Sequence, residues 1–164
     1  MANDQLPELP WIKTARSYLG VSEIPGSRHS TVIQGWLSKL GAWWRDDETP
    51  WCGVFVATCL GSGYVLPKNW MRALEWLNLG RGLSAPCYGC IVVFARQGGG
   101  HVGFVVGQDR HGNLMVLGGN QGNRVSIAAF PRSRVVAYRW PGSNPLPGRY
   151  DLPVLDGQLS KNEA

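Results

Sequence analysis

Apolar residues recur every three to four positions in two stretches of the first half of the chain. After Pro10, which suits a first helical position, apolar side chains keep this spacing until Gly20. A second stretch follows Ser30, a good N-cap residue, and continues to Gly41. The spacing places the apolar side chains on one face, so it predicts two amphipathic helices that face the core.

A third stretch is apolar on nearly all sides. It follows Thr49 and Pro50, a cap residue and a proline of the kind that helix starts tolerate. Such a segment predicts a buried central helix that begins at this pair. A shorter helix is expected over 70–78. Its inward-facing residues should be Trp70, Leu74 and Leu77.

The second half of the chain changes to short β-prone runs separated by turn-rich segments. These runs are 91–94, 102–106, 114–117, 125–127 and 135–138. Their spacing predicts an antiparallel meander of about five strands. Helices first and strands afterwards predict an α+β fold, in which the N-terminal helices pack on one face of the sheet.

The length of 164 residues suits a single domain, but the composition changes near its end. Prolines and glycines become frequent after Pro141. We therefore expect one folded domain over 1–140, followed by an extended or loosely docked tail over 141–164.

Charge and targeting signals narrow the possible partners. The net charge of +5 favours polyanions, but the arginines are scattered and form no nucleic-acid motif, so we expect no nucleic acid as partner. The first residues show no basic run followed by an apolar stretch, so no signal peptide is expected, and no stretch reaches the roughly 18 consecutive apolar residues of a membrane span. The sequence predicts a protein without an integral membrane segment. It would be made in the cytoplasm and reach an external target only after export or lysis.

Cys52 is the first candidate for chemistry. It falls in the first turn of the predicted central helix, where free backbone N–H groups and the helix dipole stabilise a thiolate and lower the thiol pKa. The alternative is a small buried residue in an apolar helix, which is the commoner place for a free cysteine.

His101 and Asn120 complete a possible catalytic set. His101 opens a strand directly after three glycines, which leave room for close approach to the imidazole. A histidine beside a helix-start thiol can take the thiol proton and return it to a leaving amine. Asn120 ends the next strand and is the first choice to orient the imidazole, with Gln121 as second choice. The alternatives are an exposed histidine in a turn and an ordinary Gly-Gly-Asn-Gln-Gly turn.

Four segments in this order resemble one family. They are LGVSEIPG at 19–26, DDETPWC at 46–52, GHVGFVVG at 100–107 and LGGNQ at 117–121. Together they resemble the CHAP/NlpC-like cysteine peptidoglycan hydrolases, common in phages and prophages, over residues 10–140. The resemblance implies a papain-like core in which 1–140 is the catalytic domain. It also places the nucleophile at the start of the central helix, the histidine on the sheet and a third polar residue on the next strand. These roles fall on Cys52, His101 and Asn120.

Two positions depart from the family pattern. Trp51 stands where NlpC-type members carry an aspartate before the cysteine, so the resemblance is closer to the CHAP side. Cys90 stands where relatives tend to have an aspartate after glycine, before the first long strand.

These residues and the resemblance predict a hydrolase of bacterial peptidoglycan that uses a thioester and needs no cofactor or metal. It would be a cysteine endopeptidase or an N-acetylmuramoyl-L-alanine amidase. Two alternatives stay open: a non-catalytic wall-binding module on the same fold, and a papain-like amidase or acyltransferase on another substrate. A phage lysin and a secreted antibacterial effector both fit. An effector would add an immunity protein or a secretion carrier as partner.

The remaining signals are weaker. Cys87 and Cys90 form a C-x-x-C pair, but a zinc site lacks its second ligand pair, so a loop disulfide or free thiols are expected. The acidic run 46–48 is expected to be a solvated turn. The tryptophans at 43, 44, 51 and 70 are candidates for a glycan groove or for the core. Substrate contacts are expected at Trp51, Trp70 and Gln121.

Overall fold

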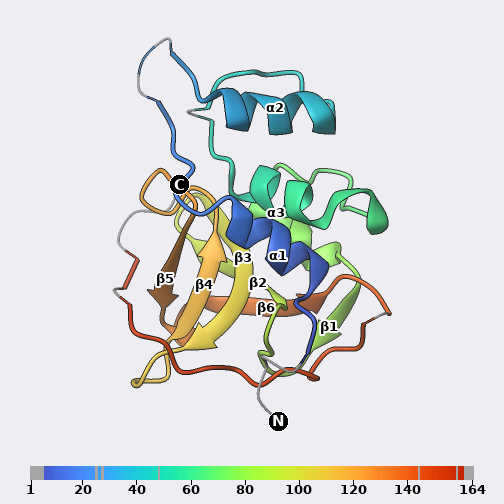
Figure 1. Ribbon diagram of the computed structural model, residues 1–164, viewed down its shortest axis with the longest axis vertical. Coiled ribbons are helices and arrows are strands. Elements are labelled where there is room, and N and C mark those ends of the chain that lie inside the picture. The colour runs from blue at the N-terminus through green and yellow to red at the C-terminus, as the bar shows by residue number, and fades with distance from the viewer. Residues whose placement is uncertain are drawn as a thin grey trace.

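The computed structural model describes residues 6–24, 26, 28–47, 49–143, 145–157 and 159–160 (Figure 1). Its helices are α1 (Pro10–Ser17), α2 (Thr31–Leu40) and α3 (Cys52–Leu60), with short 3-10 helices η2 (Gly61–Gly63), η3 (Ala73–Asn78) and η4 (Arg132–Arg134). Its strands are β1 (Arg81–Leu83), β2 (Ile91–Arg96), β3 (Gly99–Gln108), β4 (Leu114–Gly118), β5 (Ser126–Phe130) and β6 (Val135–Trp140). The α+β prediction is confirmed.

Helix α2 begins and ends where its local sequence predicts. The Ser30 hydroxyl accepts a hydrogen bond from the Ile33 N–H at 3.3 Å and caps the first turn. Gly41 ends the helix in the left-handed conformation, with φ of 76°, that favours glycine. Helix α1 ends at Ser17, slightly earlier than Gly20.

Helix α3 begins later than predicted. Its N-cap is Trp51, and Cys52 is its first residue. The prediction of a cap at Thr49 is wrong because Asp46 holds this residue in a turn: Asp46 Oδ1 accepts from the Thr49 N–H at 2.6 Å and from its hydroxyl at 2.8 Å. The sulfur of Cys52 therefore lies at the very start of the helix.

The segment over 70–78 is only partly helical and turns a different face inward. Its helix η3 is of the 3-10 type, with three residues per turn, so residues at i and i+3 share a side. Ala73 and Trp76 are buried, whereas Leu74 is 40% exposed. Of the predicted inward set, Trp70 and Leu77 are half-buried and pack against the core, as expected. The prediction is wrong for Leu74, and it missed Ala73 and Trp76, because it assumed α-helical spacing.

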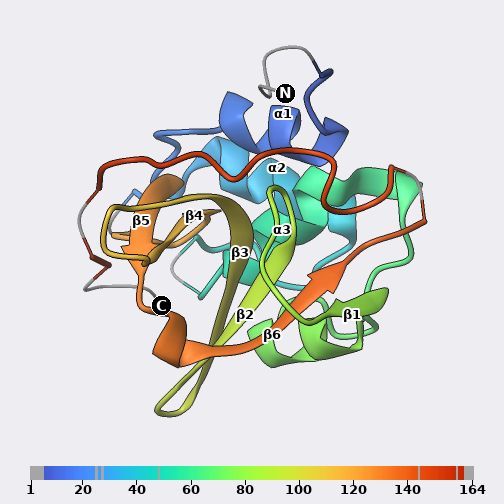
Figure 2. The same ribbon diagram turned by 90° about the horizontal axis from the view of Figure 1, so that it is seen from below.

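The described strands form one six-stranded antiparallel sheet in the order β1-β6-β2-β3-β4-β5. Strands β2 to β5 are a meander as predicted. The last predicted strand, β6, does not extend the meander, because Pro131 and η4 carry the chain across the sheet to pair with β2 (Figure 2). The additional short strand β1 then pairs with β6 at the sheet edge.

Helix α3 packs directly on the sheet. The rings of Phe55 and Phe104 meet edge to face with centroids 6.3 Å apart. Figure 1 shows α1 beside α3 and α2 beyond it, farther from the strands. Within the described residues, no helix has both the length and the apolar character that crossing a membrane requires.

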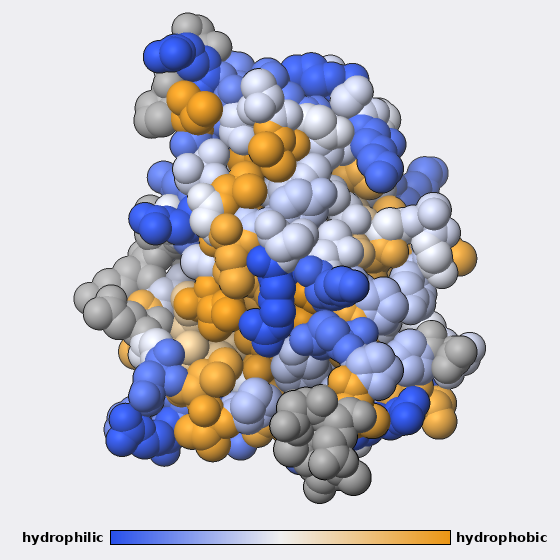
Figure 3. Space-filling model, in the orientation of Figure 1, coloured by the Kyte–Doolittle hydropathy of each residue, from blue (hydrophilic) through white to orange (hydrophobic). Residues whose placement is uncertain are grey.

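After β6 the tail runs back along the sheet without forming a helix in its described part (Figure 2). Gln108 exchanges backbone hydrogen bonds with this segment, accepting from the Leu155 N–H at 2.7 Å and donating to the Pro153 carbonyl at 2.9 Å. A second bridge joins Leu159 to Ala129 in β5. On the face that Figure 3 shows, hydrophilic side chains appear in separate groups with apolar residues between them.

Candidate active site

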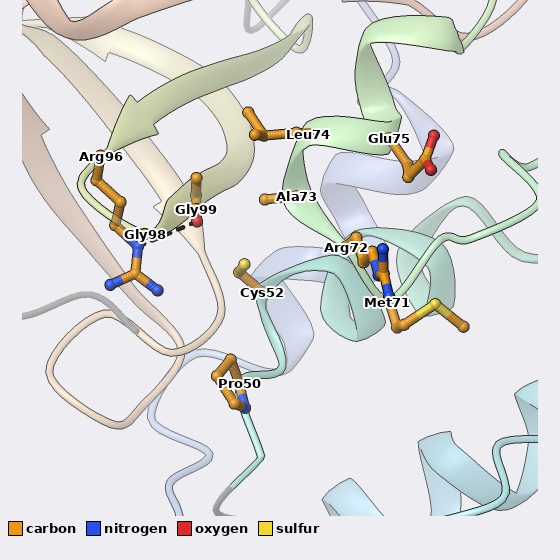
Figure 4. A pocket seen from close by; sticks show the side chains of 11 residues that line it. Pro50, Cys52, Met71, Arg72, Ala73, Leu74, Glu75, Arg96, Gly98 and Gly99 are labelled. Carbon is orange, nitrogen blue, oxygen red and sulfur yellow. Dashed lines mark hydrogen bonds between the residues drawn. The ribbon is translucent and has the colours of Figure 1, made fainter.

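Cys52 lines an open cavity of about 620 Å³. Its sulfur is directed into the space between η3 and the tip of the β2–β3 hairpin (Figure 4). The other lining residues are Pro50, Met71, Arg72, Ala73, Leu74, Glu75, Arg96, Gly98, Gly99 and Gly100. The two arginines and Glu75 carried no sequence signal, because only the fold brings η3 opposite the hairpin.

Two glycines allow these walls to close around the start of α3. A Cβ atom at Gly53 would lie 2.3 Å from the carbonyl oxygen of Trp70, so α3 and the segment before η3 approach backbone to backbone. A Cβ atom at Gly100 would lie 2.7 Å from both Leu74 Cδ2 and the Phe94 carbonyl oxygen. Larger residues at either position would push η3 away from Cys52.

Burial raises the pKa of the Cys52 thiol above its ordinary value. The backbone N–H groups of Val102 and Gly53, the charge of Arg96 and the N–H of Cys52 itself act in the opposite direction. The predicted stabilisation by the helix start is therefore present, but the expected net lowering of the pKa is wrong, because the residue is only 3% exposed. At neutral pH the free protein carries a thiol that needs a base to become a nucleophile.

The start of α3 lies against β3 at the candidate histidine. The Val102 N–H acts on the Cys52 sulfur, and Val102 directly follows His101 in β3. Two segments that lie about fifty residues apart in the sequence therefore meet here. The first turn of α3 and the strand that carries the imidazole form one local structure.

His101 is fully buried, so it is not an exposed turn residue. Its ring stacks on Phe130 with centroids 5.4 Å apart and lies 6.3 Å from the ring of Phe94. The guanidinium of Arg134 lies 5.5 Å from the centroid of Phe130. These aromatic neighbours fix the plane of the imidazole.

Gln121 fixes which nitrogen of His101 carries the proton. The Gln121 amide nitrogen donates to the carbonyl oxygens of Val116 and Ser126, at 3.1 and 2.9 Å, which sets the orientation of the carboxamide. Its Oε1 then lies 3.0 Å from His101 Nε2. Because that oxygen can only accept, Nε2 of the imidazole must be protonated. Nδ1 is then the nitrogen that can take a proton.

Asn120, the first choice for this contact, does not make it. Its backbone is left-handed, with φ of 61°, so the chain turns at this residue and directs the side chain of Gln121 to the imidazole. Asn120 is buried, and its carboxamide nitrogen and oxygen have no hydrogen-bond partner among the described residues. The geometry replaces Asn120 by Gln121 as the partner of His101.

The two tryptophans expected to contact substrate lie elsewhere. Trp51 is 1% exposed, packs on Trp36 and donates from its indole N–H to Glu23 Oε1 at 2.8 Å. Trp70 is half-buried against the ring of Trp44, at 6.1 Å between centroids. Neither side chain is among the residues that line the Cys52 cavity. Gln121 is bonded to His101, so of the three expected substrate contacts none has its side chain free at the wall of the Cys52 cavity.

Asp47, expected in a solvated turn, is fully buried. It accepts from the backbone N–H groups of Ile24 and Ser30 at 2.8 and 2.6 Å and pairs with His29 Nδ1 at 2.9 Å. It therefore ties the loop before α2 to the segment that leads into α3. The sequence pattern misses this role, since a run of acidic residues alone indicates solvent exposure. Glu48 lies outside the described residues.

Cys87 and Cys90 are free thiols in a turn before β2. The Cys90 side chain hydrogen-bonds to Cys87 and lowers the pKa of the Cys87 thiol, although partial burial opposes this. Burial raises the pKa of the Cys90 thiol well above its ordinary value. Within the described part of the chain, no group of three His, Cys, Asp or Glu residues is arranged to hold a metal ion.

Comparison with protein families gives one match. Residues 44–120 match the family model of the CHAP domain. The matched stretch includes Cys52, His101 and Asn120 and ends one residue before Gln121, so it is shorter than the resemblance over 10–140. No curated protein sequence matches the chain.

Proposed function

Because the chain carries a CHAP domain, we propose that it hydrolyses a peptide or amide bond of the bacterial peptidoglycan stem, with Cys52 as nucleophile and His101 as base. CHAP domains are generally hydrolases of the cysteine peptidase or amidase type, and peptidoglycan is the substrate that the family implies. The protein would act on the cell wall after export or lysis.

The observation that carries this proposal is that three groups lie on adjoining elements of the fold. A thiol at the start of a helix lines an open cavity, the strand of a buried histidine lies against it, and Gln121 leaves Nδ1 as the basic nitrogen. These are a nucleophile, a base and a group that orients the base.

In the proposed reaction, Nδ1 of His101 takes the thiol proton as Sγ of Cys52 attacks the carbonyl carbon of the scissile amide. The N–H groups at the start of α3, including those of Cys52 and Gly53, would stabilise the negative oxygen that forms. The C–N bond then breaks, the imidazolium gives its proton to the leaving amine, and a thioester remains. Water, activated by the same imidazole, hydrolyses the thioester and regenerates the thiol.

The test is hydrolysis of purified peptidoglycan by wild type and by Cys52→Ala. Wild type should release new amino groups, and the variant should lose at least about 1,000-fold of the rate, as expected when a nucleophile is removed. Cys87→Ala is the matched control, since it removes a thiol outside the cavity, and it should keep the wild-type rate.

Three results would contradict the proposal. Amine release that survives Cys52→Ala would remove the mechanism. Binding of the wall by wild type without any amine release would favour a non-catalytic wall-binding module. Activity on simple amides but not on peptidoglycan would point to another substrate.

A further inference from the structure

A second cavity, of about 520 Å³, lies next to the Cys52 cavity. Its lining residues are Trp43, Trp44, Asp46, Thr49, Pro50, Asn69, Met71 and Arg72. Pro50, Met71 and Arg72 line both cavities, so the two share a wall. A ligand that fills the second cavity can therefore extend into the space in front of the Cys52 sulfur.

Trp43 is the unusual residue of this cavity. Its side chain is 89% exposed. This is unusual because indole is among the largest apolar side chains, and burying it in the core would usually stabilise the fold. Its ring meets Trp44 edge to face at 5.4 Å between centroids, and Trp44 in turn packs on Trp70. This row of indoles supports Trp43 from one side and leaves its ring open to solvent.

The polar groups around Trp43 are already held in place. Asp46 accepts two hydrogen bonds from Thr49, and Asn69 donates from its amide nitrogen to Glu75 Oε1 at 3.2 Å. Arg72 lies between the two cavities, in reach of either. The lining is thus half apolar and half polar, with acceptors and donors arranged beside an aromatic face.

This combination matches a sugar ring better than an apolar peptide side chain. A pyranose has an apolar C–H face that can stack on an indole and a rim of hydroxyl groups that need hydrogen-bond partners. An apolar side chain would cover the four polar lining residues without adding any hydrogen bond to them, and it would favour a more uniformly apolar wall.

We propose that the Trp43 cavity binds a sugar ring of the glycan strand, so that the bond presented to Cys52 is the amide that joins the glycan to the first residue of the stem peptide. This rests on the proposed hydrolase function and selects one bond within it. Water adds across that amide: the sugar keeps a free carboxylate, and the peptide gains a free N-terminal amine.

The first experiment compares two substrates with wild-type protein: a disaccharide-peptide fragment of peptidoglycan and the same peptide without sugars. The first should be cleaved, with a sugar carboxylate and an intact free peptide detected by mass spectrometry. The second should not be cleaved measurably. Cleavage inside the peptide, or equal rates on both substrates, overturns the proposal while leaving a peptidoglycan hydrolase.

The second experiment removes the indole. Trp43→Ala should raise KM for the disaccharide-peptide about tenfold or more with kcat changed less than about threefold, because the ring binds substrate without touching the reacting atoms. Trp43→Phe should recover most of the loss. Val65→Ala is the matched control, because Val65 is equally exposed, at 89%, and lines neither cavity. An unchanged KM in Trp43→Ala contradicts the sugar site.

A binding measurement tests the proposed sugar site independently of the proposed hydrolase activity. The probe is a tetramer of N-acetylglucosamine, titrated into Cys52→Ala and into Cys52→Ala with Trp43→Ala, and followed by calorimetry. Binding that disappears with Trp43 supports the sugar site even when wild type shows no hydrolysis. Hydrolysis by wild type without any saccharide binding overturns the sugar site and leaves the hydrolase.

Discussion

Two of the molecule's thiols, Cys52 and Cys87, lie in sites with opposite properties. Cys52 lines a cavity, begins a helix and lies against the strand of a buried histidine, yet burial raises the pKa of its thiol. Cys87 lies half-buried in a turn, and the hydrogen bond from Cys90 lowers the pKa of its thiol. The thiol with the lowered pKa is thus the one outside the Cys52 cavity.

The comparison shows that a low thiol pKa does not by itself make a cysteine suitable for catalysis. A low thiol pKa reports only the groups that touch the sulfur, whereas catalysis also needs space for a substrate and a base that can return the proton. Of these two sites, the Cys52 site has both a described cavity and the strand of a buried histidine beside it. Variants that change one property of the Cys52 site at a time, with the Cys87 turn as the reference, can therefore test which property matters.

Among variants that keep Cys52, the largest effect is expected from Gln121→Leu, which removes the acceptor for His101 Nε2. The imidazole then loses the bond that fixes its tautomer, so we expect kcat for peptidoglycan hydrolysis to fall about 10- to 100-fold. Alkylation of Cys87 should not change, because that turn makes no contact with Gln121. The measurement is kcat for amine release, together with circular dichroism to show that the variant folds.

Asn120→Gly is the companion variant, and it decides between the two candidate amides. Glycine accepts the left-handed backbone at this position, with φ of 61°, and removes only the carboxamide. The rate should fall less than about threefold. A large loss in Asn120→Gly with a small one in Gln121→Leu would return the orienting role to Asn120.

A smaller effect, a difference of about tenfold, is expected between the alkylation rates of the thiols. At pH 7 iodoacetamide should label Cys87 at least about ten times faster than Cys52 in the free protein, because only thiolates react. Cys52 labelling should increase as pH rises beyond the usual thiol range, since its pKa is raised. Cys59 should be slowest, because burial raises its pKa well above the ordinary value. Peptide mapping by mass spectrometry measures all three rates.

Preferential labelling of Cys52 at pH 7 would contradict this order. It would mean that His101 already holds the proton in the free protein, so that the two groups form an ion pair before substrate binds. A Cys87→Ala background gives a clean measurement of Cys52 alone.

The sequence predicts those features that depend on neighbouring residues. Helix α2 follows from Ser30 and Gly41, whose effects act within one turn. Strands β2 to β5 follow from short β-prone runs separated by turn-rich segments. The order of Cys52 and His101 along the chain, on a helix start and a strand, is also visible from local pattern and family resemblance.

Features that depend on distant contacts are missed. The pairing of β6 with β2 depends on the path of η4, and the burial of Asp47 depends on the backbone N–H groups of Ile24 and Ser30. The exchange of Asn120 for Gln121 comes from a single left-handed residue, which shifts by one position the side chain that meets His101. Spacing alone does not encode such a turn.

The smallest effect is expected from Asp47→Asn. This variant tests whether Asp47 stabilises the start of α3 more than it stabilises the Cys87 turn. Burial of Asp47 opposes its charge, but the bonds from Ser30, Ile24 and His29 together lower its pKa. The stabilisation is therefore fully present above the unfolded-state pKa near 4 and is lost as pH falls through the lower folded-state value. The variant should lose about 1–2 kcal/mol of unfolding free energy at pH 7, the difference between charged and neutral acceptors.

Denaturant unfolding at pH 7 and at pH 3 measures both the loss and its pH dependence. The variant should show a smaller drop in stability between the two pH values than wild type. Asp109→Asn is the matched control: Asp109 also accepts three hydrogen bonds, from His111 and Asn113, but in an exposed turn, so the change should be much smaller. Loosening at Asp47 should also speed alkylation of Cys52 a few-fold and leave Cys87 unchanged. Equal changes at both thiols would show that Asp47 supports the whole fold rather than the entrance to α3.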